Sequence, residues 1–234
     1  TEGGESAVTT PAPVWLERPA RPCMLGLVWT VLFAIFFIMA GQYAFFATPG
    51  RLLDRFDTKI APTLDGTAYM QTAKLGLETQ RDGRRINSDI KLADDLAAIQ
   101  WLRSNIVGTP LVLEATSAAD PHPRLYSWGN RVAIYTGLPT VIGWDHHQRQ
   151  QRNGTPMIEQ RTGDVLKMFA TANAEETKAL MRQYGVDFVF YGSLERFHYP
   201  AGEAKFTQLV EQGFLTPVYN QQNTMIFKVN AATQ

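Results

Sequence analysis

The chain has 234 residues, and its 22 basic side chains balance 22 acidic ones. Zero net charge and the lack of a basic run argue against nucleic-acid binding through phosphate contacts. A single cysteine excludes a disulfide framework and any multi-cysteine zinc or iron–sulfur site, and the sequence contains no CxxCH motif for covalent haem. We therefore expect no cofactor and no nucleic-acid partner.

Residues 1–23 predict a flexible tail. They are rich in Gly, Pro, Ser and Thr, and such a segment cannot bury enough apolar surface to offset the entropy lost on ordering. Cys23 lies at the expected membrane boundary, where either acylation or a bystander thiol fits the sequence. Because the chain opens with Thr1, we expect it to be processed or to be one part of a longer polypeptide.

Residues 24–46 predict a transmembrane helix. They hold 19 apolar residues out of 23 and no charge, and a helix of this length spans roughly 35 Å, enough to cross a ~30 Å hydrocarbon core. The apolar core of a secretory signal is shorter, ~7–15 residues, and starts earlier, so cleavage is not expected. Flanking charges are too balanced to orient the span. We expect it to contact the lipid bilayer and other transmembrane helices or membrane subunits.

The rest of the chain predicts an irregular connection over 47–87, with one short helix, and an α/β domain over 88–234. Residues 89–106 carry an apolar stripe at helical spacing, with Ser88 or Asp89 as the amino-terminal cap. The β-rich run 110–115 follows as a strand. A helix that leads directly into a strand is typical of an α/β unit.

Two further helix–strand units are expected, over 175–192 and 204–220, each with a glycine between the helix and the strand. A last strand forms a hairpin with the preceding one around 220–223, and TVIGW (140–144) predicts another strand. The predicted fold class is therefore α/β: a single transmembrane helix followed by a domain of two or three layers, with four or five strands.

The densest polar cluster comes directly after TVIGW. It contains Asp145, His146, His147, Arg149 and Arg152, at a position where open α/β sheets usually bind ligands. On a helix, Asp145, Arg149 and Arg152 share one face. The two arginines can grip a phosphate or carboxylate, or all three residues can form an ion-pair network that fixes the loop.

Adjacent histidines do not favour a metal site. On a helix they differ by about 100°, and on a strand they face opposite sides, so neither geometry brings both to one ion. We expect no metal. Glu114, Glu195 and Arg196 follow other strands, and in one sheet they would approach the same edge as the Asp145 cluster. The sequence has no GxSxG, P-loop or GxGxxG motif, and thus no self-sufficient active site.

Four segments of the sequence resemble a known family. These are residues 64–70 (LDGTAYM), 99–115, 131–152 and 184–199. Together they resemble the carboxyl-terminal part of the bacterial and archaeal "YYY" polytopic membrane proteins, over roughly residues 60–199. The helix ending in WLRSN, the SWGNR segment with Arg131, and YGVDFVFYG are also distantly similar to the external domain of oligosaccharyltransferase catalytic subunits. Those enzymes belong to the C superfamily of membrane glycosyltransferases, which use lipid-phosphate sugar donors.

The resemblance implies an extracytoplasmic domain, anchored in the cell membrane, of a glycosyltransferase-like membrane protein. In that superfamily the catalytic carboxylate lies in an early external loop, and nothing here matches that loop. We therefore expect a chain that is at most part of a glycosyltransferase and not catalytic on its own. Arg149 and Arg152 would contact the phosphate of a lipid-linked sugar, with Arg131 as a further binding candidate. The alternative is a single-span accessory or scaffolding subunit of a larger membrane complex.

Overall fold

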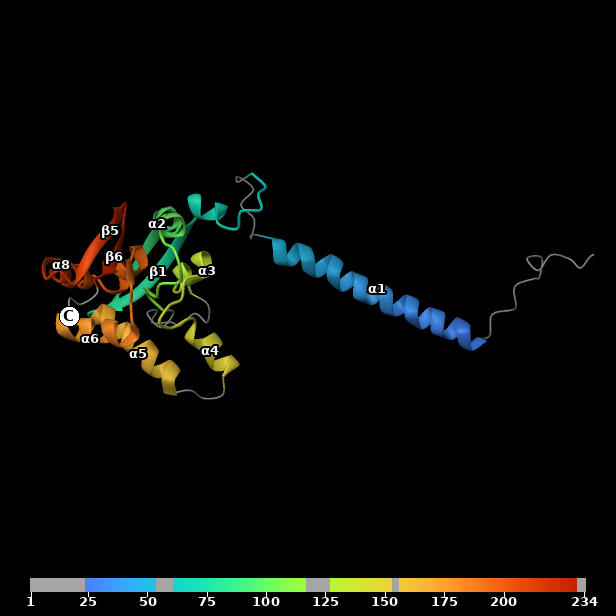
Figure 1. Cartoon of the computed structure of the whole chain (residues 1–234). Helices are drawn as coiled ribbons and strands as arrows, with labels where there is room; N and C mark the ends of the chain where they lie inside the picture. The colour runs from blue at the N-terminus through green and yellow to red at the C-terminus, as the bar shows by residue number, and fades with distance from the viewer. Residues whose placement is uncertain (1–23, 54–60, 117–126, 153–155, 231–234) are drawn as a thin grey trace, which may run out of the picture. The chain divides into compact units, whose positions relative to one another are not determined.

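The computed structural model describes residues 24–53, 61–116, 127–152 and 156–230, and the chain divides into two units, residues 1–59 and 60–234. The expected tail, 1–23 with Cys23, lies outside the described residues. In the first unit, α1 (Met24–Leu52) is one continuous helix, drawn in blue in Figure 1. Its most apolar window has a mean hydropathy of 2.3, and none of its residues is buried. The helix is long and apolar enough to cross a membrane.

The second unit is a mixed α/β domain with two sheets (Figure 1). The helices are the 3-10 helix η2 (Ala68–Gln71), α2 (Leu92–Asn105), α3 (Arg131–Thr136), α4 (Asp145–Gln151), α5 (Pro156–Ala170), α6 (Ala174–Tyr184), α7 (Ser193–His198) and α8 (Gly202–Glu211). The strands are β1 (Lys74–Arg81), β2 (Arg84–Lys91), β3 (Val112–Leu113), β4 (Phe188–Tyr191), β5 (Leu215–Gln221) and β6 (Thr224–Val229). This confirms the predicted fold class.

The larger sheet has the strand order β3-β4-β6-β5. β3 runs parallel to β4, with Val112 opposite Phe188, and β6 is antiparallel to both β4 and β5. The hairpin of β5 and β6 turns at 222–223, as the sequence predicts. Because β3 and β4 are parallel, the residues that directly follow them, Glu114 and Gly192, lie at the same end of the sheet.

The sheet is covered by helices on both faces, which gives three layers. Along β4, Phe188 and Phe190 pack with α2, whereas Val189 and Tyr191 pack with α5, α6 and α8. This alternation is the period-2 pattern of a strand that is buried on both sides. Burial on both sides also explains why the sequence of β4, FVFY, is a continuous apolar run.

The smaller sheet is an antiparallel hairpin of β1 and β2. Its two-residue turn consists of Asp82, with φ 52°, and Gly83, with φ 73°, and an Asp-Gly pair suits this turn because both positions need positive φ. The prediction of an irregular connection with one short helix was therefore wrong for residues 74–87. On the inner face of the hairpin, Ile90 packs with the apolar residues of α2.

Other local predictions were partly wrong. Ser88 and Asp89 belong to β2, so the residue that precedes α2 is Lys91. The segment TVIGW contributes only a single bridge, between Val112 and Thr140, although its apolar residues are buried. The glycine cap predicted after α6 is confirmed, since Gly185 adopts the left-handed conformation with φ 66°. The expected domain boundaries stay predictions.

Lys205 ties α8 to the end of α5. Its side chain is 4% exposed, and Nζ donates to the carbonyls of Met168, Phe169 and Thr171 at 2.6, 3.1 and 2.9 Å. The last carbonyls of a helix have no partner within the helix. Lys205 supplies that partner from another helix.

Lys205→Met should lower the free energy of unfolding by about 1–3 kcal/mol, because it leaves the carbonyls of Met168, Phe169 and Thr171 without this donor. Lys167→Met is the matched control, since Lys167 is exposed on α5, and it should change stability by less than about 0.5 kcal/mol. Chemical denaturation of the detergent-solubilised chain measures both. Equal effects of the two substitutions would contradict this role of Lys205.

Candidate functional site

A buried arginine lies at the carboxyl ends of the two parallel strands. Arg131 is the first residue of α3 and has no exposed surface. Its Nε donates to Asp95 Oδ2 at 2.5 Å, and its Nη2 and Nη1 donate to Glu195 Oε2 and Oε1 at 2.7 and 3.1 Å. The guanidinium also lies over the ring of Phe190, 4.9 Å from the centroid. Arg131 thus joins α2, α7 and β4.

Main-chain and side-chain donors hold the two acidic partners in place. Glu195 accepts from the amides of Ala115 and Gly192 at 3.0 and 2.9 Å, so it links the residues that follow β3 and β4. Asp95 accepts from Trp128 Nε1 at 2.8 Å. These bonds satisfy carboxylate oxygens that would otherwise be buried without partners.

Glu114 is the third buried carboxyl of this network. Its two oxygens accept the amides of Val132 and Ala133, each at 2.8 Å, which are in the first turn of α3. An acidic side chain at a helix amino terminus satisfies amides that have no partner in the helix and interacts favourably with the helix dipole. Glu114 therefore fixes the start of α3, and with it the position of Arg131.

Two unusual backbone positions make this packing possible. Asn130 has φ 66°; its amide donates to the carbonyl of Ala115 at 3.0 Å, and its Nδ2 donates to that of Ile142 at 2.6 Å. Gly192 is required by close approach, because a Cβ there would lie 2.7 Å from Asp95 Oδ1 and 3.0 Å from Arg131 Nη2. The network therefore depends on backbone geometry as well as on charge.

The two glutamates respond differently to burial. Burial raises the pKa of Glu114 to about 7, and the charge of Arg131 and two backbone hydrogen bonds only partly offset this. Burial also acts to raise the pKa of Glu195, but the charge and hydrogen bonds of Arg131, with the two backbone amides, outweigh it and lower this pKa. Direct contact with the guanidinium makes the difference.

Three of the sequence-predicted binding residues, Glu114, Arg131 and Glu195, therefore come together. All three are buried, and the structure uses their charges to join elements of the domain. They also meet at one edge of the sheet, as expected for the two glutamates. At most 1% of each residue is exposed, and the hydrogen bonds that the structure shows for them all lie within the domain.

Arg196 is adjacent in sequence to Glu195 but belongs to a different environment. Its guanidinium pairs with Glu203, lies 5.0 Å from the ring centroid of Tyr191, and donates through Nε to the carbonyl of Asn223 at 3.1 Å. Arg196 also follows β4, but it takes no part in the buried network, because α7 directs these neighbouring residues to different sides.

Asp145, His146, His147 and Arg149 lie in the short helix α4, whereas Arg152 directly follows it with an extended backbone. Asp145 and Arg149 make an i,i+4 ion pair at 3.4 Å. Arg149, Arg152 and His147 are exposed, and His146 is half-buried. Within the described residues, no three His, Cys, Asp or Glu side chains are placed to hold a metal ion.

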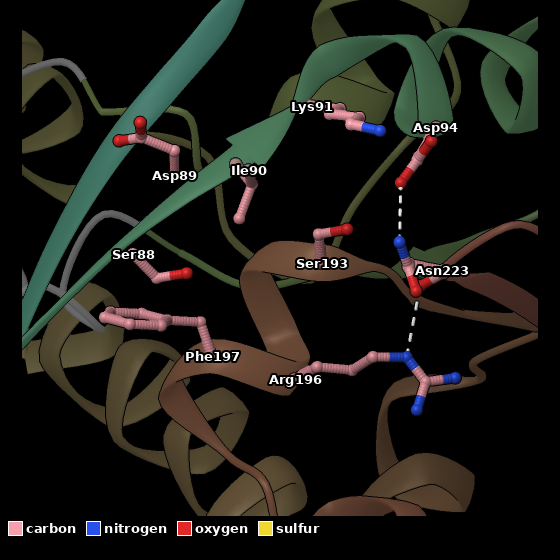
Figure 2. A pocket seen from close by; sticks show the side chains of 9 residues that line it. All are labelled: Ser88, Asp89, Ile90, Lys91, Asp94, Ser193, Arg196, Phe197 and Asn223. Carbon is pink, nitrogen blue, oxygen red and sulfur yellow. Dashed lines mark hydrogen bonds between the residues drawn. The ribbon is translucent and has the colours of Figure 1, made fainter.

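A cavity of about 370 Å³ lies on the Arg196 side of α7. Figure 2 shows the residues that line it, which come from β2, α2, α7 and the turn between β5 and β6. They are Ser88, Asp89, Ile90, Lys91, Asp94, Ser193, Arg196, Phe197 and Asn223. Of these, only Arg196 was a candidate from the sequence.

The sequence contains a signal for one of the missed residues. Asp95 lies three residues after Leu92 and four before Ile99, so it occupies the apolar face of α2. A carboxyl on such a face needs a buried partner. For Asp94 and Asn223, which are 129 positions apart, no comparable sequence signal exists.

Comparisons with known proteins include a distant structural similarity. No family model and no curated protein matches the sequence, so the resemblance to the YYY family stays a prediction. The chain is similar to the solved C-terminal globular domain of an oligosaccharyltransferase from Archaeoglobus fulgidus. The TM-score is 0.36 and the identity 13%, with 58% of this chain and 97% of the other covered.

Arg131→Met should lower the free energy of unfolding by about 3–5 kcal/mol, because it leaves Asp95 and Glu195 buried without their counter-charge. Arg103→Met, at an exposed position on α2, is the control and should have little effect. Denaturant unfolding followed by tryptophan fluorescence measures both. A loss below about 1 kcal/mol for Arg131→Met would show that the network does not hold the domain together.

Glu114 should give the domain a distinctive pH dependence. Its pKa of about 7 in the folded chain exceeds its ordinary value of 4.5, so the folded state binds this proton more tightly than the unfolded state. Its contribution to stability is therefore complete below about pH 4.5 and is lost as the pH rises to about 7. In this range the free energy of unfolding changes by at most about 1.4 kcal/mol per pH unit because of this group.

Glu114→Gln removes this titration. Gln also loses one acceptor for the α3 amides, so the variant should start less stable than the parent chain. The stability difference between the two should then shrink from pH 5 to pH 7, as measured by denaturant unfolding at each pH. A difference that stays constant across this range would contradict the raised pKa.

Proposed function

We propose that this protein is a membrane-anchored, extracytoplasmic binding domain of a glycosyltransferase-like membrane protein and has no catalytic activity of its own. The observation that carries the proposal is α1, a helix of 29 residues whose most apolar window has a mean hydropathy of 2.3. The proposal applies equally if the chain is one part of a longer protein or a single-span subunit of a complex.

The exposed side chains of α1 support a lipid environment. Phe36, Phe37 and Phe45 are 65, 69 and 73% exposed, and the neighbouring large apolar residues are similarly open. Monomeric soluble proteins rarely expose contiguous apolar patches larger than a few hundred Å². A bilayer removes this surface from water, with about 25 cal/mol gained per Å² buried.

The buried network supports a role without catalysis. Glu114, Arg131 and Glu195 are the residue types that general acid–base or phosphate chemistry would use, but each is enclosed and bonded within the domain. The segments that carry the sequence resemblance contain these same residues. The resemblance therefore concentrates on groups that hold the fold, while exposed Arg149 and Arg152 remain the proposed contacts for the phosphate of a lipid-linked sugar.

Cysteine labelling tests the anchor and its orientation together. The parent chain has one cysteine, Cys23, on the amino-terminal side of α1. A Cys23→Ser, Gln160→Cys variant moves the thiol to an exposed position on α5. In intact cells, a membrane-impermeant maleimide should label the variant and leave the parent chain unlabelled, whereas lysed cells should give labelling of both.

The same preparation provides the controls. Both chains should stay in the membrane pellet after carbonate extraction, because a span of this length is not released by removing peripheral proteins. Labelling of the parent chain alone in intact cells would reverse the proposed orientation. Release into the supernatant, or a mature chain that lacks 24–52 by mass spectrometry, would contradict the anchor.

A further inference from the structure

The exposed apolar side chains of the second unit gather around one helix, α2. In the described part of this unit, five large apolar residues are exposed, and four of them lie on or beside η2, the end of α2, and α3. These four are Leu64, Tyr69, Val107 and Ile134. Leu64 and Val107 are almost wholly exposed, and Ile134 is 49% exposed. Single exposed apolar residues are ordinary, whereas a group of neighbouring ones marks an interaction site.

The segments that carry these residues are neighbours in space. Both η2 and α3 pack against α2, and the three elements lie together in Figure 1. The hydroxyls of Tyr69 and Tyr135 share a hydrogen bond of 2.6 Å, which joins η2 directly to α3. Arg103, in the last turn of α2, is within electrostatic reach of Asp65. We call the surface that residues 61–73, 103–110 and 133–140 form the α2 face.

Turns hold the two aliphatic side chains outward. Asp65 Oδ1 accepts from the amide and the hydroxyl of Thr67 at 2.8 and 2.7 Å, so the turn beside Leu64 is held by hydrogen bonds. Val107 precedes Gly108, which has φ 85°, a conformation that glycine adopts without strain. The backbone therefore presents both apolar side chains to the outside.

The aromatic part of the α2 face suits the boundary between water and lipid. Because the hydroxyls of Tyr69 and Tyr135 bond to each other, moving them into a less polar medium costs less. The Tyr135 ring is supported by Trp128, with the ring centroids 5.9 Å apart. Tyrosine has an apolar ring and a polar tip, and it is enriched where membranes meet water.

The α2 face carries almost no charge. Its three segments contain two charged residues, Asp65 and Arg103, which are opposite in sign, whereas 19% of the whole chain is charged. The other polar side chains of these segments are hydroxyls and amides. A partner that is recognised by its charge would need an excess of one sign on this face. The composition therefore favours an uncharged, partly apolar surface as the partner.

The covalent chain ties this face to the helix that would cross the membrane. α1 ends at Leu52, and Leu64 follows 12 positions later. A chain spans at most about 3.3–3.6 Å per residue, so this link reaches no further than about 43 Å. A tether of this kind raises the effective concentration of the two surfaces, and a weak attraction is then enough for docking. A soluble partner has no such advantage.

We propose that the α2 face docks on the surface of a lipid bilayer. Leu64, Val107 and Ile134 insert among the lipid head groups, and Tyr69 lies at the boundary with water. The proposal rests on the proposed function, because it needs α1 in the membrane. It adds a second contact with the membrane, made by the α/β domain.

The test uses the full chain with Cys23→Ser, reconstituted in phosphatidylcholine liposomes. An environment-sensitive fluorophore is attached through Ser104→Cys, in the α2 face, or through Glu211→Cys on α8 as the matched control, since both positions are exposed. A lipid with a shallow doxyl quencher should quench the label at 104, because an interfacial apolar face is buried only about 5–10 Å into the head-group boundary. Iodide in the water should quench the label at 211 instead.

Acidic substitutions test which residues dock. Leu64→Asp combined with Val107→Asp should lower the ratio of docked to undocked chains about tenfold or more, measured as a loss of doxyl quenching at 104. Both residues are exposed in the folded domain, so tryptophan fluorescence should show an unchanged fold. Met157→Asp is the control, because Met157 is also an exposed apolar residue but lies on α5; it should leave the quenching unchanged.

Flotation with the liposomes separates this proposal from the proposed function. A chain that floats while its label at 104 stays open to iodide keeps its anchor but overturns the docking, and so does equal lipid quenching at 104 and 211. Quenching that survives the paired acidic substitutions would overturn it as well. A label at 104 that neither iodide nor the doxyl lipid reaches would assign the α2 face to a protein partner. A chain that does not float would contradict both proposals.

Discussion

The domain is organised around the charge of one buried guanidinium. Arg131 is reached by Asp95 from α2 and by Glu195 from α7, and Glu195 also binds the amides that follow β3 and β4. An arginine in such a place is stable only while its partners stay, since removing one partner of a buried pair costs far more than the pair contributes. Three helices and two strands are therefore positioned together.

The place that this network occupies has consequences for function. In open α/β sheets, ligands usually bind outside the carboxyl ends of the parallel strands. Here the protein's own side chains, Arg131, Asp95 and Glu195, occupy that position. A ligand at this end of the sheet would therefore contact surfaces further out, such as that of α7, where Glu195 faces the network while Arg196 lines the cavity.

The parts of the fold that the sequence predicts correctly depend on local signals. The helix–strand unit that contains Gly185 was found because a glycine cap and an apolar period lie within one segment. The Asp82–Gly83 pair is also a local signal for a hairpin turn. The hairpin was not predicted, because the strands on either side of the turn are polar. Arg131 and Asp95 are 36 positions apart, and Arg131 and Glu195 are 64 apart. Pairings at such separations are set by the packing of the sheet, which no local pattern contains.

The segment TVIGW also shows what a local sequence pattern cannot predict. Its apolar residues predict a buried strand, and Val141 and Ile142 are indeed buried, but only Thr140 forms a bridge to β3. The carbonyl of Ile142 instead accepts from Asn130 Nδ2, and this bond helps to hold the turn that places Arg131. An apolar run in the sequence predicts that its side chains are buried, but it does not predict which hydrogen bonds its backbone makes. In TVIGW the backbone helps to hold the Arg131 network and does not extend the sheet.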